Sequence, residues 1–178
     1  MRLLECRLDV DDLDSFVAEL GTIGERHDVT VQAFDARYVA DRDHLERAVE
    51  LADRAIERGE NVARDRAVEI LLYAAGRRQI DRALEMGVGE GEHRAVVLID
   101  AGPSDDADGG TDRETREAGA LERVGELEAV VSRDPTLERT DDETLCAFFD
   151  ITEAERAATD ASLSALVRER VALLEVEK

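Results

Sequence analysis

The side chains with the clearest capacity for chemistry are arginines gathered in one short stretch of the chain. From Asn61 to Arg82 there are five arginines against three acidic residues, although the whole chain of 178 residues has a formal charge of −21. A guanidinium group offers a fork of donors that matches phosphate groups and base edges. We therefore expect an anionic ligand, if the protein binds one, to contact this stretch, whose arginines are Arg64, Arg66, Arg77, Arg78 and Arg82.

Gly76 divides this stretch into two helical segments. Glycine permits a left-handed turn, so Arg77, Arg78 and Gln79 are expected at a junction near the start of the next helix, where free backbone N–H groups favour anions. Ile80, with Leu84 four residues later, is expected to anchor the turn in the core. The alternative is that these arginines only pair with the abundant carboxylates, as charged helix faces commonly do.

No pattern in the sequence predicts catalysis. The three histidines are scattered, and the two cysteines lie too far apart in the chain for a metal motif. The glycines between Gly87 and Gly91 follow a predicted helix and precede a predicted strand, which is the reverse of a dinucleotide-binding loop. We therefore predict a protein that is not an enzyme and has neither a metal ion nor a cofactor.

These residues are carried by a chain that alternates between strand-like and helix-like patterns. Strands are predicted at 2–8, 29–34 and 94–99, and the segment 38–40 could pair beside the second of them. Helical spacing is predicted at 13–20, 43–58, 63–75 and, after Gly102, from Leu121 until Pro135. The pattern predicts one α/β domain over residues 1–178, with a small mixed sheet of about four strands flanked by several helices and a helical C-terminal part.

Two segments near the C-terminal half need a separate interpretation. Residues 102–117 are acidic and lack apolar periodicity, so a flexible surface insertion is predicted there. The last helix carries an apolar stripe that either covers the domain's own core or binds a partner; the core is favoured because most helix stripes face inward. The candidates for partner binding are Phe149, Ile151, Leu163 and Val167.

The composition indicates the habitat more than the function. Lys178 is the only lysine among 23 basic residues, and 44 residues are acidic. Excess carboxylates keep a surface hydrated in a salt-saturated cytoplasm, where the Debye length falls to roughly 3 Å. Binding of RNA under those conditions has to rely on short-range contacts and stacking. Glu5 interrupts the N-terminus before any apolar run develops, so a cytoplasmic location is expected.

The segment from Glu69 to Val88, with Arg-Arg-Gln-Ile directly after Gly76, resembles a known family signature. That family is the small tRNA-recruiting, kinase-binding subunit of the KEOPS complex, which helps to make threonylcarbamoyladenosine in tRNA. The resemblance extends over essentially the whole chain, except for residues 102–117. Together with the acidic composition it implies a halophilic, archaeal source.

The resemblance implies an α/β fold and a non-catalytic role. Such a subunit holds the 3′ CCA end of tRNA and binds the small kinase-like ATPase of the complex, while other subunits perform the modification. The tRNA role passes to Arg77, Arg78, Gln79 and Ile80, with Arg64 as a further candidate. The kinase-binding role passes more loosely to the C-terminal candidates. The competing hypothesis is a pure protein adaptor that regulates a kinase-like ATPase without touching RNA.

Overall fold

The computed structural model describes residues 1–103 and 109–176. Two compact units are formed by this chain, and each contains two separate segments. The first unit comprises residues 1–34 and 88–136, and the second comprises residues 35–87 and 137–178. The prediction of a single domain over residues 1–178 remains a prediction.

The first unit is built on a sheet with the strand order β2-β3-β1-β4. Strand β1 (Arg2–Val10) pairs antiparallel with β3 (Gly91–Asp100) on one side and with β4 (Val130–Arg133) on the other. Helix α1 (Leu13–His27) connects β1 to β2 (Thr30–Asp35), and α5 (Gly109–Gly125) connects β3 to β4. This order and these two helical connections give the split β-α-β arrangement of ferredoxin-like folds.

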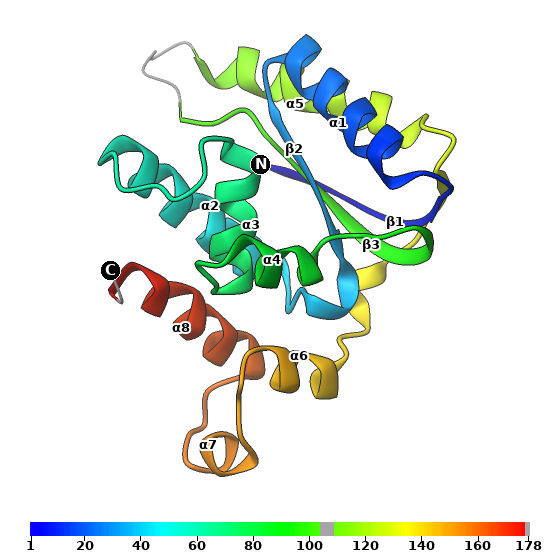
Figure 1. Cartoon of the computed structure of the whole chain (residues 1–178). Helices are drawn as coiled ribbons and strands as arrows, with labels where there is room; N and C mark the ends of the chain where they lie inside the picture. Colours follow the sequence, from blue (N-terminus) through cyan, green and yellow to red (C-terminus); the bar gives the residue numbers. More distant parts are fainter. Residues whose placement is uncertain (104–108, 177–178) are drawn as a thin grey trace. The chain divides into compact units, whose positions relative to one another are not determined.

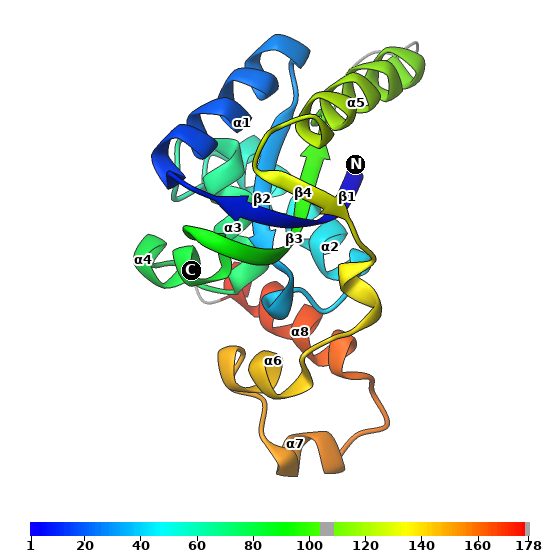
Figure 2. The ribbon, with the colours of Figure 1, turned by 90° about the vertical axis from the view of Figure 1, so that its right-hand side faces the viewer.

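Helices α1 and α5 lie beside one another on one face of this sheet (Figure 1; Figure 2). The period of two along β1 places every second side chain toward them. These side chains meet the apolar stripes of both helices in one hydrophobic core. The buried members include Leu4, Cys6 and Leu8 from β1, Phe16 and Leu20 from α1, Val97 from β3, and Ala120 and Val124 from α5.

The fourth strand lies where the sequence predicted the end of a helix. Residues 130–133 form β4 at an edge of the sheet, and Val131 is 62% exposed, so little burial marks it in the sequence. The candidate strand at 38–40 is wrong, because Ala36–Tyr38 form the 3-10 helix η1. Asp35 caps this turn by accepting a hydrogen bond from the Arg37 backbone N–H at 3.0 Å. The expected number of strands is nevertheless confirmed.

The predicted insertion at 102–117 is shorter than expected at its C-terminal side. Helix α5 begins at Gly109, and residues 104–108 lie outside the described residues. Arg113 fastens the first turns of α5 to the end of β3 through an ion pair with Asp100 at 2.9 Å, and it also pairs with Glu117 one turn along α5 at 3.2 Å. The Asp100 and Glu117 side chains are almost fully buried, so this part of the predicted insertion is an ordered helix in contact with the core.

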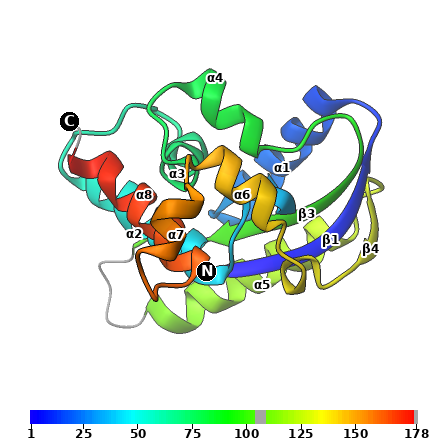
Figure 3. The same ribbon diagram turned by 90° about the horizontal axis from the view of Figure 1, so that it is seen from below.

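The second unit is mainly helical (Figure 3). Helix α2 (Arg42–Glu57) packs against α3 (Arg66–Ala75) and against α8 (Leu163–Val176), and α3 also contacts α8. Shorter elements complete it, namely α4 (Ile80–Ala83), the 3-10 helices η2 (Leu84–Met86) and η3 (Thr136–Glu138, which straddles the unit boundary), α6 (Asp142–Phe148) and α7 (Glu153–Ala157). The expected helical C-terminal part is confirmed.

His44 ties three segments of this unit together. Its Nδ1 accepts a hydrogen bond from the Ala40 backbone N–H at 3.2 Å, and its Nε2 lies 2.8 Å from the Ala74 carbonyl oxygen. The side chain is completely buried, and this desolvation lowers its pKa from 6.5 to about 4. A neutral imidazole that donates from Nε2 satisfies both contacts, which joins α2 to the end of α3.

Candidate RNA- and partner-binding sites

The junction between α3 and α4 forms as the sequence predicts. Helix α3 ends at Ala75, and Gly76 takes the left-handed conformation with φ 60°. The backbone N–H of Arg77 donates to the Leu72 carbonyl oxygen at 3.0 Å, which closes the helix end. The chain then leaves the helix with Arg77, Arg78 and Gln79 in irregular structure before α4 begins.

The anchoring of this junction differs from the prediction. Ile80 is 43% exposed and Leu84 is 55% exposed, whereas Ala83 and Met86 are fully buried. Helix α4 has only one turn and continues as the 3-10 helix η2, which changes the angular spacing of side chains. Ala83 and Met86 therefore hold the turn in the core. So short a helix also adds little dipole field, so the expected attraction of anions to its first N–H groups is not supported.

The five arginines of the basic stretch have different environments. Arg66 forms a bidentate ion pair with Asp53, with N–O distances of 2.7 and 2.9 Å, and so fastens α3 to α2. Arg82 lies 3.5 Å from Glu85, at the limit of an ion pair. Within the described part of the chain, the exposed side chains of Arg64 and Arg78 form no hydrogen bond or ion pair. Among the junction arginines, the alternative of pairing with carboxylates thus fits Arg77 and Arg82, at long distances of 3.4 and 3.5 Å, but not Arg78 in the described part of the chain.

Arg77 is also engaged by its own fold. Its Nη2 donates to the Phe148 carbonyl oxygen at the C-terminal end of α6 and lies 3.4 Å from the Asp150 carboxylate. The guanidinium carbon sits over the Phe148 ring, 5.5 Å from its centre. The Phe148 ring in turn packs against Tyr38 at 4.8 Å between centres. Arg77 therefore joins the junction to the end of α6, a link between residues far apart in the sequence.

A cleft opens beside this link. Its volume is about 470 Å³, within the usual range of small-molecule clefts, which is roughly 300–1,000 Å³. It is lined mainly by polar side chains from the junction, from α4 and η2, and from the end of α6, namely Arg77, Gln79, Arg82, Glu85, Phe148 and Asp150. Arg77, Gln79 and Arg82 thus line the same cleft. Arg78 borders a separate depression of about 30 Å³.

The C-terminal candidates for partner binding lie mostly in the core of the second unit. Phe149, Ile151 and Val167 are buried in a hydrophobic cluster with Leu145 and Leu166. Leu163 is partly exposed and packs against the same cluster. Side chains that fill this core cannot contact a partner while the unit keeps this fold. The interpretation of the stripe as core is supported, and Leu163 alone remains accessible.

A polar network holds this end of the unit. Arg170 of α8 donates to both carboxylate oxygens of Glu155, at 2.7 and 2.8 Å, and to the Phe149 carbonyl oxygen at 3.1 Å. Thr152 caps α7 by accepting a hydrogen bond from the Glu155 backbone N–H at 3.1 Å. Arg170, the one charged member of the apolar stripe, therefore has a structural role.

Sequence reasoning missed the contributions of Tyr38 and Asp150 to the cleft region. Tyr38 is the last residue of the 3-10 helix η1, and Asp150 lies in the loop after α6 with φ 53°. Neither belongs to a periodic pattern, and neither is near Arg77 in the chain. The proximity of Arg and aromatic side chains in space carries no signal in the spacing of a single sequence.

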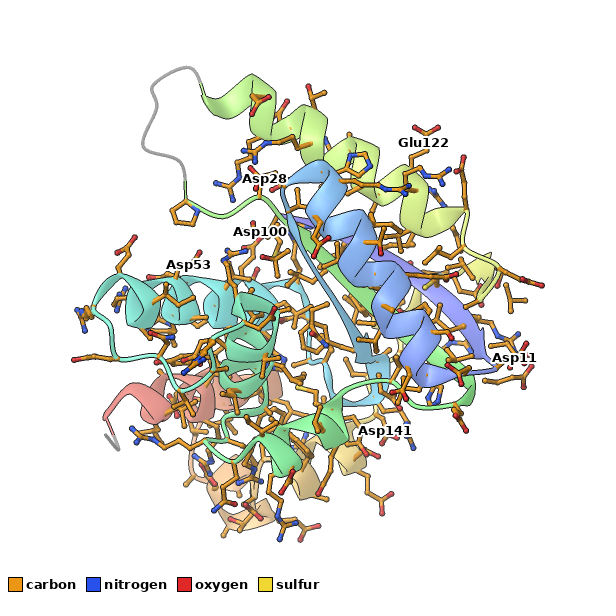
Figure 4. The ribbon with its side chains drawn as sticks, turned by 45° about the horizontal axis from the view of Figure 1, so that its top comes forward. Asp11, Asp28, Asp53, Asp100, Glu122 and Asp141 are labelled. Carbon is orange, nitrogen blue, oxygen red and sulfur yellow. The ribbon has the colours of Figure 1, made fainter. Side chains whose placement is uncertain are left out.

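The carboxylates are distributed over separate elements. In the first unit, Asp11, Asp28 and Glu122 project from different places (Figure 4). Among residues 1–103 and 109–176, no group of three His, Cys, Asp or Glu residues is arranged to hold a metal ion. None of the helices in that part of the chain is both long and apolar enough to cross a membrane.

Comparison with known proteins identifies the family. The family model described as "Kinase binding protein CGI-121" matches residues 9–175, which covers both units. The chain belongs to the CGI-121 family of kinase-binding proteins. Among curated proteins, no relative matches the chain. The CGI-121 description agrees with the expected binding of a kinase-like partner, and membership in this family is consistent with the expected KEOPS subunit.

Proposed function

We propose that this protein is the non-catalytic subunit of KEOPS that binds tRNA at its 3′ CCA end and recruits it for threonylcarbamoyladenosine modification. The observation that carries the proposal is the exposed Arg78-Gln79 pair beside the cleft. Among the described residues, neither side chain has a protein partner, although the chain contains 44 acidic residues. An arginine left unpaired in so acidic a protein is suited to an anionic ligand.

The kinase-like ATPase of KEOPS is the proposed protein partner. Leu163 is the accessible member of the predicted set, and Leu173 on the same helix is 44% exposed. Apolar side chains that remain accessible on a helix are suited to the core of a protein–protein interface. We expect Leu163→Asp to weaken capture of the ATPase subunit in a pull-down, and Leu173→Asp provides a second variant on α8.

The test of RNA binding compares intact tRNA with tRNA trimmed of its CCA end, in molar potassium chloride. Selective loss of binding on trimming, together with loss on Arg78→Glu, supports recruitment of tRNA through the junction. Glu153→Gln, at an exposed position on α7, serves as a charge-changing control. Equal binding of both RNAs, or no binding, contradicts the proposal.

The second candidate is a protein adaptor that regulates the kinase-like ATPase and never contacts RNA. It is favoured by the formal charge of −21, since a strongly acidic chain repels a polyanion at ordinary salt. This hypothesis predicts that the ATPase is captured normally while no tRNA binds at any salt concentration. Binding that depends on the CCA end and on Arg78 would reject it.

A further inference from the structure

The cleft beside Arg77 has a composition that differs from that of an ordinary phosphate site. It contains two guanidinium groups, Arg77 and Arg82, and two carboxylates, Glu85 and Asp150, so that their formal charges cancel. A site for a phosphate group would be expected to hold an excess of positive charge. The polar, electrically balanced lining instead suits a neutral ligand that both donates and accepts hydrogen bonds.

Arg77 also presents a flat surface to this cleft. Its bonds to the Phe148 carbonyl oxygen and toward Asp150 come from N–H groups, which lie in the guanidinium plane. The guanidinium carbon lies over the Phe148 ring, 5.5 Å from its centre. The Arg77 side chain is 36% exposed and lines the cleft, and unpaired bases of RNA commonly stack on an arginine guanidinium. The Phe148 ring packs in turn against Tyr38, so two aromatic side chains support Arg77 from this side.

The remaining groups match the other parts of a nucleoside. The Gln79 amide carries both a donor and an acceptor, which is the combination that reads a base edge. The Asp150 side chain is 79% exposed, and its ion pair with Arg77 is long, at 3.4 Å. A carboxylate has about four acceptor positions, so Asp150 retains capacity for the hydroxyl groups of a ribose.

From these observations we infer that the cleft binds one unpaired ribonucleoside of RNA, with its base stacked on Arg77 and its ribose hydroxyl groups donating to Asp150. This inference rests on the proposed binding of tRNA and specifies how its terminal nucleoside is recognised. The contact with Asp150 makes the site selective for ribose over deoxyribose. Arg82 also lines the cleft with a side chain that is 68% exposed, so it can meet the phosphate on the 5′ side of the terminal nucleoside.

The test uses two tRNAs that differ only in the sugar of the terminal adenosine. One ends in adenosine and the other in 2′,3′-dideoxyadenosine, and both are measured against the full chain by fluorescence anisotropy in molar potassium chloride. The wild-type protein is expected to bind the dideoxy form about tenfold more weakly, which is typical of losing a hydrogen bond to a charged group. Equal binding of the two forms would overturn the inference.

The Asp150 side chain is tested by the variant Asp150→Gly. Glycine tolerates the φ of 53° that Asp150 adopts, so the backbone can be retained when the carboxylate is removed. The variant is expected to bind both tRNAs with affinities that agree within about twofold. The control Glu153→Gln removes a carboxylate outside the cleft and is expected to keep the tenfold difference. A thermal melt of each variant establishes that the fold is intact.

The outcomes separate this inference from the proposed function. CCA-dependent binding that is lost in Arg78→Glu, without any preference for the ribose hydroxyl groups, would overturn only the inference. A preference for ribose that persists in Asp150→Gly would overturn the role of Asp150. Absence of tRNA binding by the wild-type protein would overturn the proposed function and the inference together.

Discussion

Two regions of the second unit were predicted to be functional surfaces, and one of them is exposed in the structure while the other is mostly buried. The α3–α4 junction exposes Arg78, Gln79 and Ile80, and none of these three side chains lies in the core. The C-terminal cluster buries Phe149, Ile151 and Val167. Charged and amide groups at a break between helices thus remain available to a ligand, whereas the side chains of an apolar stripe are buried in the protein's own core.

The difference follows from what each residue type costs to bury. A buried valine or phenylalanine contributes roughly 1.5–3 kcal/mol of transfer free energy, so the fold gains by covering it. A guanidinium group has to be paired before it can be buried, and Arg66 shows this with Asp53. An arginine that remains exposed and unpaired is therefore a better indicator of a binding site than an apolar stripe is.

The largest effect is expected from a charge in the buried cluster. Val167 is completely buried, so Val167→Asp is expected to lower the free energy of unfolding by at least about 4 kcal/mol, because a carboxylate is desolvated without a partner. Leu173→Asp on the same helix is the matched control, since Leu173 is 44% exposed. Urea denaturation measures both. A stable Val167→Asp variant that fails only to capture the ATPase would show that the cluster is a partner surface.

The next effect concerns the dependence of stability on pH. The pKa of His44 in the folded protein is lowered to about 4 because the side chain is fully buried, while the unfolded value is near 6.5. The unfolded chain therefore binds a proton first as the pH falls. The stability contributed by neutral His44 is complete above pH 6.5 and is lost between about 6.5 and 4, by about 1.4 kcal/mol for each pH unit.

Urea denaturation at pH 7, 6 and 5 measures this slope, above the range in which most carboxylates titrate. The variant His44→Gln is the control, because it removes the titrating group. It is expected to be less stable at pH 7, since the contacts to Ala40 and Ala74 are disturbed, but its stability should change less between pH 7 and 5. The same slope in both proteins would contradict the role assigned to His44.

The adjacent arginines of the junction give a smaller and more specific contrast. Arg77→Ala leaves the Phe148 carbonyl oxygen without this donor and is expected to lower the free energy of unfolding by about 1–2 kcal/mol. Arg78→Ala removes an exposed side chain and is expected to change it by less than about 0.5 kcal/mol. Binding of tRNA should nevertheless weaken in both. Equal stability of the two variants would show that the link from Arg77 to α6 contributes nothing.

Much of the fold could be predicted from local patterns in the sequence. The strands β1, β2 and β3, the helix α2 and the cap at Gly76 each have a clear period or an end signal, and the structure confirms them. Strand β4 was missed because four edge residues with one exposed valine carry neither an alternating pattern nor a continuous apolar run. The start of α5 was missed because its first turns are held by ion pairs of Arg113 rather than by an apolar stripe.

The candidate site could be predicted only in part for a different reason. The exposure of Arg78 and Gln79 follows from a glycine that ends a helix, which is a local signal. The engagement of Arg77 with Phe148 and Asp150 depends on how α6 packs near the junction. No pattern in one sequence reports a contact between segments so far apart. The sequence could therefore indicate the junction but not the cleft beside it.

The smallest effect sharpens the comparison at the residue that begins the junction. Gly76 has φ 60°, and a Cβ added there would lie 3.4 Å from the Arg170 carbonyl oxygen. Gly76→Ala is expected to lower the free energy of unfolding by about 1 kcal/mol, because alanine is strained in this conformation. Gly21→Ala in the middle of α1 is the matched control, since nothing lies within 4 Å of its added Cβ. It should raise stability by up to about 1 kcal/mol, so the two substitutions should shift the midpoint of urea denaturation in opposite directions. A shift in the same direction for both would mean that the left-handed turn at Gly76 does not constrain the exposed junction.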